Sequence, residues 1–260
     1  MALVKTGQPR TGLARALSKQ GYCSRSQAAQ LIHAGRVSLN GRVRRDPETP
    51  VHSGQDRIEV DGVPILVSQK IYLMLNKPRG VVTTASDEKG RSTVYDFLDR
   101  KSWVAPVGRL DKASEGLLLL TNDSQWAALI TAPATHLDKT YHVRIDSPAD
   151  EALLDRLLHG VRTEDGDFLR VKRARILRGV ERRAWLEIVL DEGKNRHIRR
   201  MIEHLGIEIL RLVRVAIGPL VLGELKKGAL RQLTPAEKNL MDAAMLRPGS
   251  PKPSLGATFP

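Results

Sequence analysis

The chain has 260 residues, of which 42 are Lys or Arg and 29 are Asp or Glu, so its formal charge is +13 at pH 7. This balance is typical of proteins that bind nucleic acids or other anionic surfaces, and it carries no information about the fold. Cys23 is the only cysteine, which excludes an intramolecular disulfide, and no Cys/His cluster has the spacing of a zinc site. There is no signal-peptide pattern and no apolar run long enough to span a membrane, so we expect a soluble, cytoplasmic protein.

The first 45 residues contain nine basic residues and no acidic one. Apolar residues at helical spacing predict a short helix over 13–21 and a second helix over 24–35, each ending at a glycine. Ser24 and Gln27 fit a capping box at the start of the second helix. An acid-free stretch of this length indicates contact with phosphate groups.

Alternating apolar residues precede each of the dipeptides Asn40-Gly41 and Asp61-Gly62, which are strong signals for hairpin turns. Together with the two basic helices, this arrangement resembles the RNA-binding domain named after small-subunit ribosomal protein S-four, over residues 11–66. In that family the second helix and the following turn face the RNA. The resemblance therefore implies a set of RNA-contact candidates: Ser24, Arg25, Gln27, Arg36, Asn40 and Arg42. The alternative is that these side chains are only solvated, with Arg25 and Asn40 serving the cap and the turn.

A strand is predicted over 71–75, because five apolar residues there end at a turn with Pro78 and Gly80. The turn also contains Lys77 and Arg79. These two cations could hold backbone phosphates or could be ordinary loop charges.

Residues 108–123, with the sequence GRLDKASEGLLLLTND, form the central segment of the chain. The four consecutive leucines predict a short buried strand, which places Asp111 on a loop at the edge of a rigid core. Judged by spacing alone, an Asp beside Arg109 is more often a surface salt bridge or a turn cap than a catalyst.

The second half of the chain alternates between helical and strand patterns, and its end is rich in proline. We expect helices over 126–130, 149–158 and from 235 onward, and strands over 139–145, 169–177, 183–190 and 212–222. Residues 246–260 contain four prolines among small residues, which predicts a disordered tail.

Another helix is predicted to begin after Gly193 and to end at Gly206. Its first turns contain five basic residues: Lys194, Arg196, His197, Arg199 and Arg200. Positive charge at the N-terminal end of a helix opposes the helix dipole, so we expect a partner anion to compensate it. Salt bridges within the protein, to acids such as Asp191 and Glu192, are the alternative.

Four segments, YLMLNKPRGVVTT, GRLDKASEGLLLLTND, KTY and GKNRHIRR, resemble in this order the motifs of the pseudouridine synthases. The likeness is to the branch named after the ribosomal small-subunit enzyme RsuA, which includes RluB-type enzymes. In that family the Asp of GRLD is catalytic, the Tyr of KTY packs on the target base, and an Arg of the last motif pairs with the Asp. The resemblance thus implies Asp111, Tyr141 and Arg199 as catalytic residues, with Arg200 as the alternative for the third.

Further contacts with RNA are implied by the same resemblance. Arg109 is the candidate to fill the stack that a flipped base vacates. Lys77, Arg79, Lys194, Arg196 and Arg200 are candidates for phosphate contacts. The sequence departs from the family pattern at Ser124, where a Gly is common, and 112–114 is variable; neither change affects the proposed chemistry.

The implied fold class is α+β. A small N-terminal α/β RNA-binding domain, 11–66, precedes a catalytic domain, 71–241, with a mixed, mainly antiparallel β-sheet flanked by helices. The implied enzyme is an RNA pseudouridine synthase, which breaks the glycosidic bond of a uridine, rotates the base and rejoins it through carbon five. Neither a metal nor an organic cofactor is implied. Whether Asp111 adds covalently or removes a sugar proton stays open.

The expected partner is ribosomal RNA or a ribosome assembly intermediate, bound by a monomer. Large-subunit RNA is preferred over small-subunit RNA by analogy only. Two other classes of protein remain: a non-catalytic, ribosome-associated RNA-binding factor, and a DNA-binding or membrane-surface protein suggested by charge alone.

Overall fold

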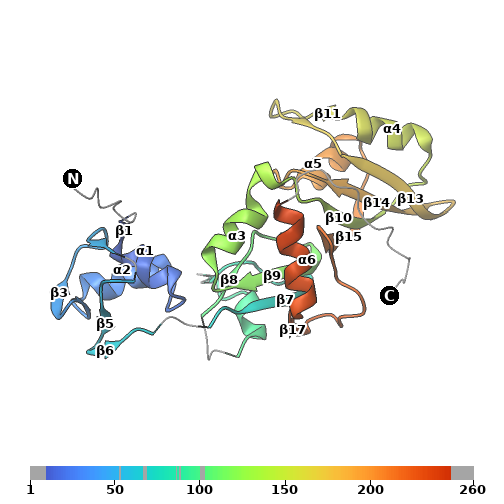
Figure 1. Cartoon of the computed structure of the whole chain (residues 1–260). Coiled ribbons are helices and arrows are strands. Elements are labelled where there is room, and N and C mark those ends of the chain that lie inside the picture. The colour runs from blue at the N-terminus through green and yellow to red at the C-terminus, as the bar shows by residue number, and fades with distance from the viewer. Residues whose placement is uncertain are drawn as a thin grey trace, which may run out of the picture. The chain divides into compact units, whose positions relative to one another are not determined.

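The computed structural model describes residues 10–52, 54–66, 69–85, 87, 89–99 and 103–246 (Figure 1). Its contacts divide the chain into two compact units. The N-terminal unit comprises Met1–Tyr72, Asp99–Ala105 and Leu120–Trp126, and the larger unit comprises Leu73–Leu98, Pro106–Leu119 and Ala127–Pro260. The predicted disordered tail lies outside the described residues beyond Leu246. None of the helices within the described ranges is both long and apolar enough to cross a membrane.

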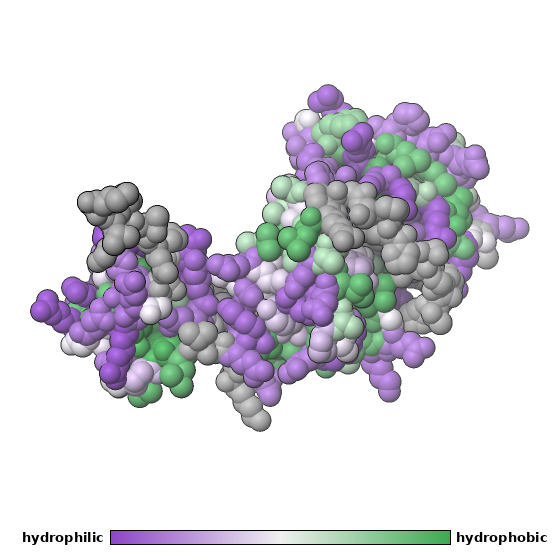
Figure 2. All heavy atoms as spheres, viewed as in Figure 1, coloured by the Kyte–Doolittle hydropathy of each residue, from purple (hydrophilic) through white to green (hydrophobic). Residues whose placement is uncertain are grey.

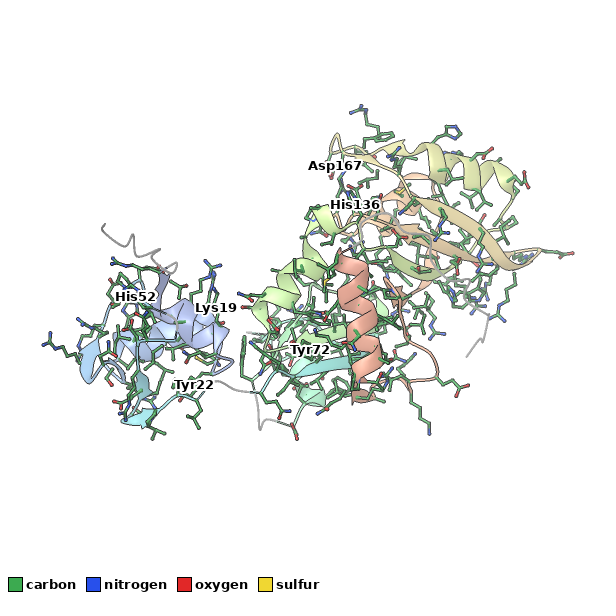
Figure 3. All side chains as sticks on the ribbon, viewed as in Figure 1. Lys19, Tyr22, His52, Tyr72, His136 and Asp167 are labelled. Carbon is green, nitrogen blue, oxygen red and sulfur yellow. The ribbon has the colours of Figure 1, made fainter. Side chains whose placement is uncertain are left out.

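Two helices of the N-terminal unit confirm the sequence prediction. They are α1 (Leu13–Lys19) and α2 (Arg25–His33), and Lys19 at the end of α1 is labelled in Figure 3. The capping box forms as expected, because the Ser24 hydroxyl accepts from the Gln27 amide while the Gln27 side chain accepts from the Ser24 amide. The face of this unit seen in Figure 2 is mostly hydrophilic.

The hairpins of the N-terminal unit also follow the sequence signals. One sheet has the order β3-β2-β5-β6, and β1 pairs with β4 in a second, two-stranded sheet. Their bounds are β1 (Thr11–Gly12), β2 (Val37–Leu39), β3 (Arg42–Arg44), β4 (Pro50–Val51), β5 (Ile58–Val60) and β6 (Val63–Pro64). Both turn dipeptides, Asn40-Gly41 and Asp61-Gly62, have positive φ at each residue, as a two-residue hairpin of this hand requires.

One long sheet, most of whose residues belong to the larger unit, has the order β13-β14-β10-β15-β9-β7-β17. Its strands are β7 (Tyr72–Lys77), β9 (Glu115–Thr121), β10 (Lys139–Ile145), β13 (Arg173–Val180), β14 (Arg183–Leu190), β15 (Ile209–Ile217) and β17 (Leu230–Gln232). β8 (Ala105–Pro106) pairs with β9, and β16 (Leu220–Val221) pairs with β15. The β15–β9 pair is parallel, whereas β13–β14, β14–β10, β10–β15 and β7–β17 are antiparallel. The predicted mixed, mainly antiparallel sheet is confirmed.

The remaining elements flank this sheet (Figure 1). They are the helices α3 (Ser124–Thr131), α4 (Glu151–His159), α5 (His197–His204) and α6 (Pro235–Leu246), the 3-10 turns η1 (Val94–Phe97) and η2 (Pro133–Thr135), and the small hairpin β11 (Val161–Arg162) and β12 (Phe168–Leu169). Leucines of α4 and apolar residues of α5 join one buried cluster with alternate residues of β10, β14 and β15. These two helices therefore cover one face of the sheet.

The strand predicted over 169–177 is wrong in its extent. The chain leaves the β11–β12 hairpin at Leu169 and enters the main sheet only at Arg173. Between them, the Val171 amide donates to the Leu157 carbonyl and the Lys172 amide to the Val189 carbonyl. The break depends on these tertiary partners, which a local pattern cannot register.

Candidate active site

The buried side chain of Lys77 binds the loop that contains Asp111. The Lys77 ammonium donates to the carbonyl oxygens of Pro78 at 3.1 Å, Asp111 at 3.1 Å and Ser114 at 2.8 Å. Lys77 has no exposed surface. The prediction that Lys77 contacts RNA phosphate is therefore wrong: its charge faces the protein interior. Arg79 is exposed, so its predicted role stays open.

Two more contacts fix the same loop. The Thr83 hydroxyl donates to the Leu110 carbonyl at 2.8 Å, and the Gly80 amide donates to the Lys112 carbonyl at 2.7 Å. The segment after β7 thus binds the backbone on both sides of Asp111. A carboxylate on such a loop is oriented without using its own oxygens.

Burial lowers the pKa of Lys77 to about 8. Below this pH the ammonium has three N–H groups for three carbonyls, whereas the neutral amine has only two. We expect turnover to fall as pH rises through about 8, because the neutral amine of Lys77 holds the Asp111 loop with fewer hydrogen bonds. A pH–rate profile at saturating RNA measures this, and a profile that stays flat to pH 9.5 would contradict it.

The backbone of β9, the strand with the four leucines, lies very close to the backbone of β15. Gly116 has φ +102°, and a Cβ built there would lie 2.3 Å from the Arg214 carbonyl oxygen. Only glycine fits this position. The approach also lets the Arg214 Nε donate to the Leu117 carbonyl at 2.8 Å, which fixes the plane of the guanidinium. All seven residues of β9 are buried, as predicted for the four leucines.

A pocket of about 650 Å³ is lined by the Asp111 loop, by residues of β10 and β15 and by the segment that leads into α5, and all its lining residues belong to the larger unit. Asp111, Tyr141, Arg199 and Arg214 line it, with Arg109. Tyr141 is half-buried on β10 and lies directly opposite Arg214 of β15, next to a break in the register. Such β-bulges re-aim side chains beside functional sites. The structure brings the three predicted catalytic residues into one pocket.

Arg199 contacts the backbone of the Asp111 loop rather than the carboxylate itself. Its Nη2 donates to the Ala113 carbonyl at 3.0 Å and to the Ser114 hydroxyl at 3.5 Å. No ion pair joins Asp111 to any side chain that the structure describes, so the expected direct pairing with Arg199 is absent here. Burial lowers the pKa of Arg199, and the charge of Asp111 acts in the opposite direction. The two charges therefore interact without a direct hydrogen bond.

In the sequence, Arg214 only interrupts an apolar run, and no functional role was predicted for it. Its side chain is 6% exposed, and its Nη2 has no hydrogen-bond partner among the described residues. Arg199 is 8% exposed, and its Nε likewise has no hydrogen-bond partner among the described residues. A buried donor without a partner is costly, so both groups are available to an acceptor that enters the pocket. The signal in the sequence was a charge at the centre of a buried strand.

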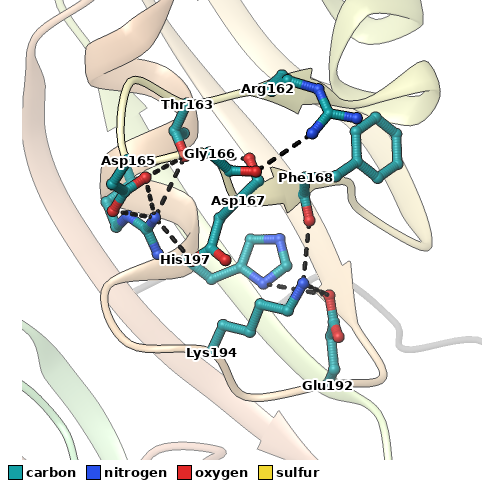
Figure 4. A network of polar contacts seen from close by, with 10 residues as sticks. Arg162, Thr163, Asp165, Gly166, Asp167, Phe168, Glu192, Lys194 and His197 are labelled. Atoms are coloured by element: carbon teal, nitrogen blue, oxygen red, sulfur yellow. Dashed lines mark hydrogen bonds and ion pairs between the residues drawn. The ribbon is translucent and has the colours of Figure 1, made fainter.

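Three of the basic residues at the start of α5 form ion pairs within the protein, and Figure 4 shows the contact between Lys194 and Glu192. Arg200 binds Asp165 and Asp167, Lys194 lies 3.7 Å from Glu192, and Arg196 pairs with Glu203 at 3.2 Å. Asp167, labelled in Figure 3, lies at the turn of the β11–β12 hairpin. The alternative of internal salt bridges is thus correct for these three cations, although most of the acids differ from those expected. The alternative that Arg200 is the arginine that pairs with Asp111 is therefore wrong, because the charge of Arg200 is already paired.

The candidates in the N-terminal unit fall into two groups. Ser24 and Gln27 form the helix cap, and Arg36 makes a bidentate ion pair with Asp61. Asn40 has φ +53°, donates to Asp56 and accepts from the Arg57 amide, so it serves the turn. The second group is Arg25 and Arg42, which are exposed and form no ion pair with the residues described.

Comparison with known proteins agrees with this geometry. Residues 71–204 match the family model described as RNA pseudouridylate synthase, and residues 11–58 match the S4 domain model. The chain is 37% identical to the ribosomal large subunit pseudouridine synthase B of Bacillus subtilis over 86% of this chain and 93% of that protein. An uncharacterized RNA pseudouridine synthase of Aquifex aeolicus is 39% identical over 85% of this chain and 89% of that protein.

A solved structure supports the same assignment. The crystal structure of a pseudouridylate synthase superposes with a TM-score of 0.61 at 30% identity, covering 90% of this chain and all of that one. An α+β fold, an S4 domain and a pocket with Asp111, Tyr141 and Arg199 together lead to one conclusion: the chain belongs to the RNA pseudouridine synthase family.

Proposed function

We propose that this enzyme converts one or more uridines of large-subunit ribosomal RNA to pseudouridine, with Asp111 as the catalytic residue. The observation that carries the role of Asp111 is its position in the pocket, on a loop bound from both sides by the segment after β7. The choice of RNA rests on the relatives from Bacillus subtilis and Haemophilus influenzae, which are named ribosomal large subunit pseudouridine synthase B.

The reaction breaks the bond between the ribose and N1 of uracil and forms a bond to carbon five. Asp111 either adds covalently to the ribose or the base or removes a proton from the sugar, and each of these roles requires the ionised carboxylate. The buried cations Lys77 and Arg199 donate hydrogen bonds to the backbone of the same loop and so place positive charge close to the carboxyl group. The unpartnered N–H groups of Arg199 and Arg214 are donors for oxygen atoms of the bound nucleotide.

A uridine inside folded RNA must be flipped out to enter this pocket, at a cost of a few kcal/mol. The exposed Arg109 lies on the pocket lining and takes the vacated place in the stack. The face of Tyr141 packs on the flipped base, a contact worth about 1–3 kcal/mol. Residues 71–241 form the catalytic domain and residues 11–66 the RNA-binding domain, with Arg25, Arg42 and Arg79 left as exposed phosphate contacts.

The test is to map pseudouridines in ribosomal RNA from cells that lack the protein and from cells complemented with the wild-type chain. We expect one or a few large-subunit positions to lose the modification and to regain it on complementation. A change at a small-subunit position would keep the reaction and correct the substrate. No change in any ribosomal RNA would overturn the proposed substrate.

A further inference from the structure

The face of the sheet opposite the pocket has an unusual row of side chains. On β10, Tyr141, Val143 and Ile145 face the cluster under α4 and α5, so Arg144 faces the other way. Arg144 lies directly opposite Trp185 of β14 and directly opposite Arg211 of β15. Trp185 in turn lies opposite Arg178 of β13. Four neighbouring strands thus align Arg178, Trp185, Arg144 and Arg211 across the sheet, which we call the arginine–tryptophan row.

The tryptophan orders two of these arginines. The guanidinium carbon of Arg178 lies 5.6 Å from the centroid of the Trp185 ring, and that of Arg211 lies 5.9 Å from it. Both distances are within the range of cation–π attraction. Arg178 is exposed and Trp185 is half-buried. The guanidinium groups are therefore positioned in advance at the surface, which lowers the entropy cost of binding an anion.

The charges of Arg144 and Arg211 are not fully balanced within the described residues. Arg144 and Arg211 are like charges directly opposite each other, an arrangement that destabilises a sheet. Glu115 compensates Arg211 at 3.0 Å but also binds Lys227. Arg144 forms no ion pair with any residue that the structure describes. Local stability does not explain why Arg144 lies opposite Arg211, whereas a bound anion would.

The adjacent residues Arg175 on β13, Glu187 on β14 and His142 on β10 form a second row, in which the charges are balanced. There Glu187 accepts two hydrogen bonds from Arg175 and lies 3.6 Å from His142. The wider hairpin is strongly basic: residues 170–183 contain seven Arg or Lys and one acidic residue. The positive surface thus extends over β13 and its turn, beyond the row itself.

We propose that the arginine–tryptophan row is a second RNA-binding surface, which holds backbone phosphates of the substrate RNA at a distance from the target uridine. The inference rests on the proposed function only for the identity of the RNA. Because the row faces away from Tyr141, it contacts RNA segments that the pocket does not reach. Its role is to bind long RNA, and the chemical step does not depend on it.

The test compares two double variants with the same change in charge. Arg144→Gln with Arg178→Gln removes two cations of the row but leaves Arg211, which Glu115 needs. Arg156→Gln with Arg162→Gln removes two exposed cations from α4 and β11, outside the row. Thermal unfolding checks that both variants are folded. The measurement is filter binding to large-subunit RNA at several salt concentrations, with turnover on that RNA and on a short RNA that contains the target uridine.

For the row variant we expect affinity for long RNA to fall by about tenfold, and the slope of log affinity against log salt to become shallower by about 1.4 to 1.8. KM for long RNA should rise while kcat on the short RNA stays unchanged. The control variant should match the wild type. Equal losses in both variants, or an unchanged slope in the row variant, would overturn the inference. A wild type that binds RNA but forms no pseudouridine would instead contradict the proposed function.

Discussion

Replacing Asp111 with Asn should lower the rate of pseudouridine formation by about 10⁴-fold or more, the scale seen when a central catalytic group is removed. The amide has nearly the shape of the carboxylate but is neither a nucleophile nor a base. The backbone of the loop stays bound by Lys77, Thr83 and Gly80, so the fold should not change. The formation of a bond at carbon five releases the hydrogen there, so release of tritium from RNA labelled at that carbon measures turnover.

The matched control is Asp155→Asn, which makes the same change on the exposed surface of α4. It should retain wild-type turnover. RNA affinity should be similar in both variants, because neither position supplies a phosphate contact. Turnover within tenfold of wild type in Asp111→Asn would show that another group performs the chemistry.

Replacing Lys77 with Met should lower both stability and turnover. The side chains are similar in length, but Met offers no donor to the carbonyls of Pro78, Asp111 and Ser114. A buried carbonyl left without a partner costs roughly 1–3 kcal/mol, and part of this is offset because a buried charge is also removed. We expect a net loss of about 3 kcal/mol in the free energy of unfolding. Urea unfolding measures it.

Turnover separates the positioning role of Lys77 from a general loss of stability. At a temperature where the Lys77→Met protein is still folded, kcat should fall while RNA affinity is retained, because the Asp111 loop has lost its support. Lys112→Met, on the same loop but exposed, serves as the control and should leave both quantities near wild type. If Lys77→Met weakened RNA binding and left kcat unchanged, this result would support the prediction that Lys77 contacts an RNA phosphate.

Several features of this protein were determined by the sequence alone. The dipeptides Asn40-Gly41 and Asp61-Gly62 specify their turns, because both positions require positive φ, which these residues tolerate. The strands β10 and β14 were predicted with their observed bounds, because the apolar pattern of a strand is a local property. Asp111 and Tyr141 were identified by motifs, and the structure places both in one pocket.

Only the tertiary structure decided how the charges are used. Lys77 and Arg79 are two residues apart and look alike in sequence, yet one is buried under the Asp111 loop and the other is exposed. The acids that neutralise Arg200 come from a hairpin 33 and 35 residues away. Arg214 and Arg144 lie on neighbouring strands and face opposite sides of the sheet. Pairing register and burial are non-local, and the energy of a charge depends on both, so no local pattern can predict its role.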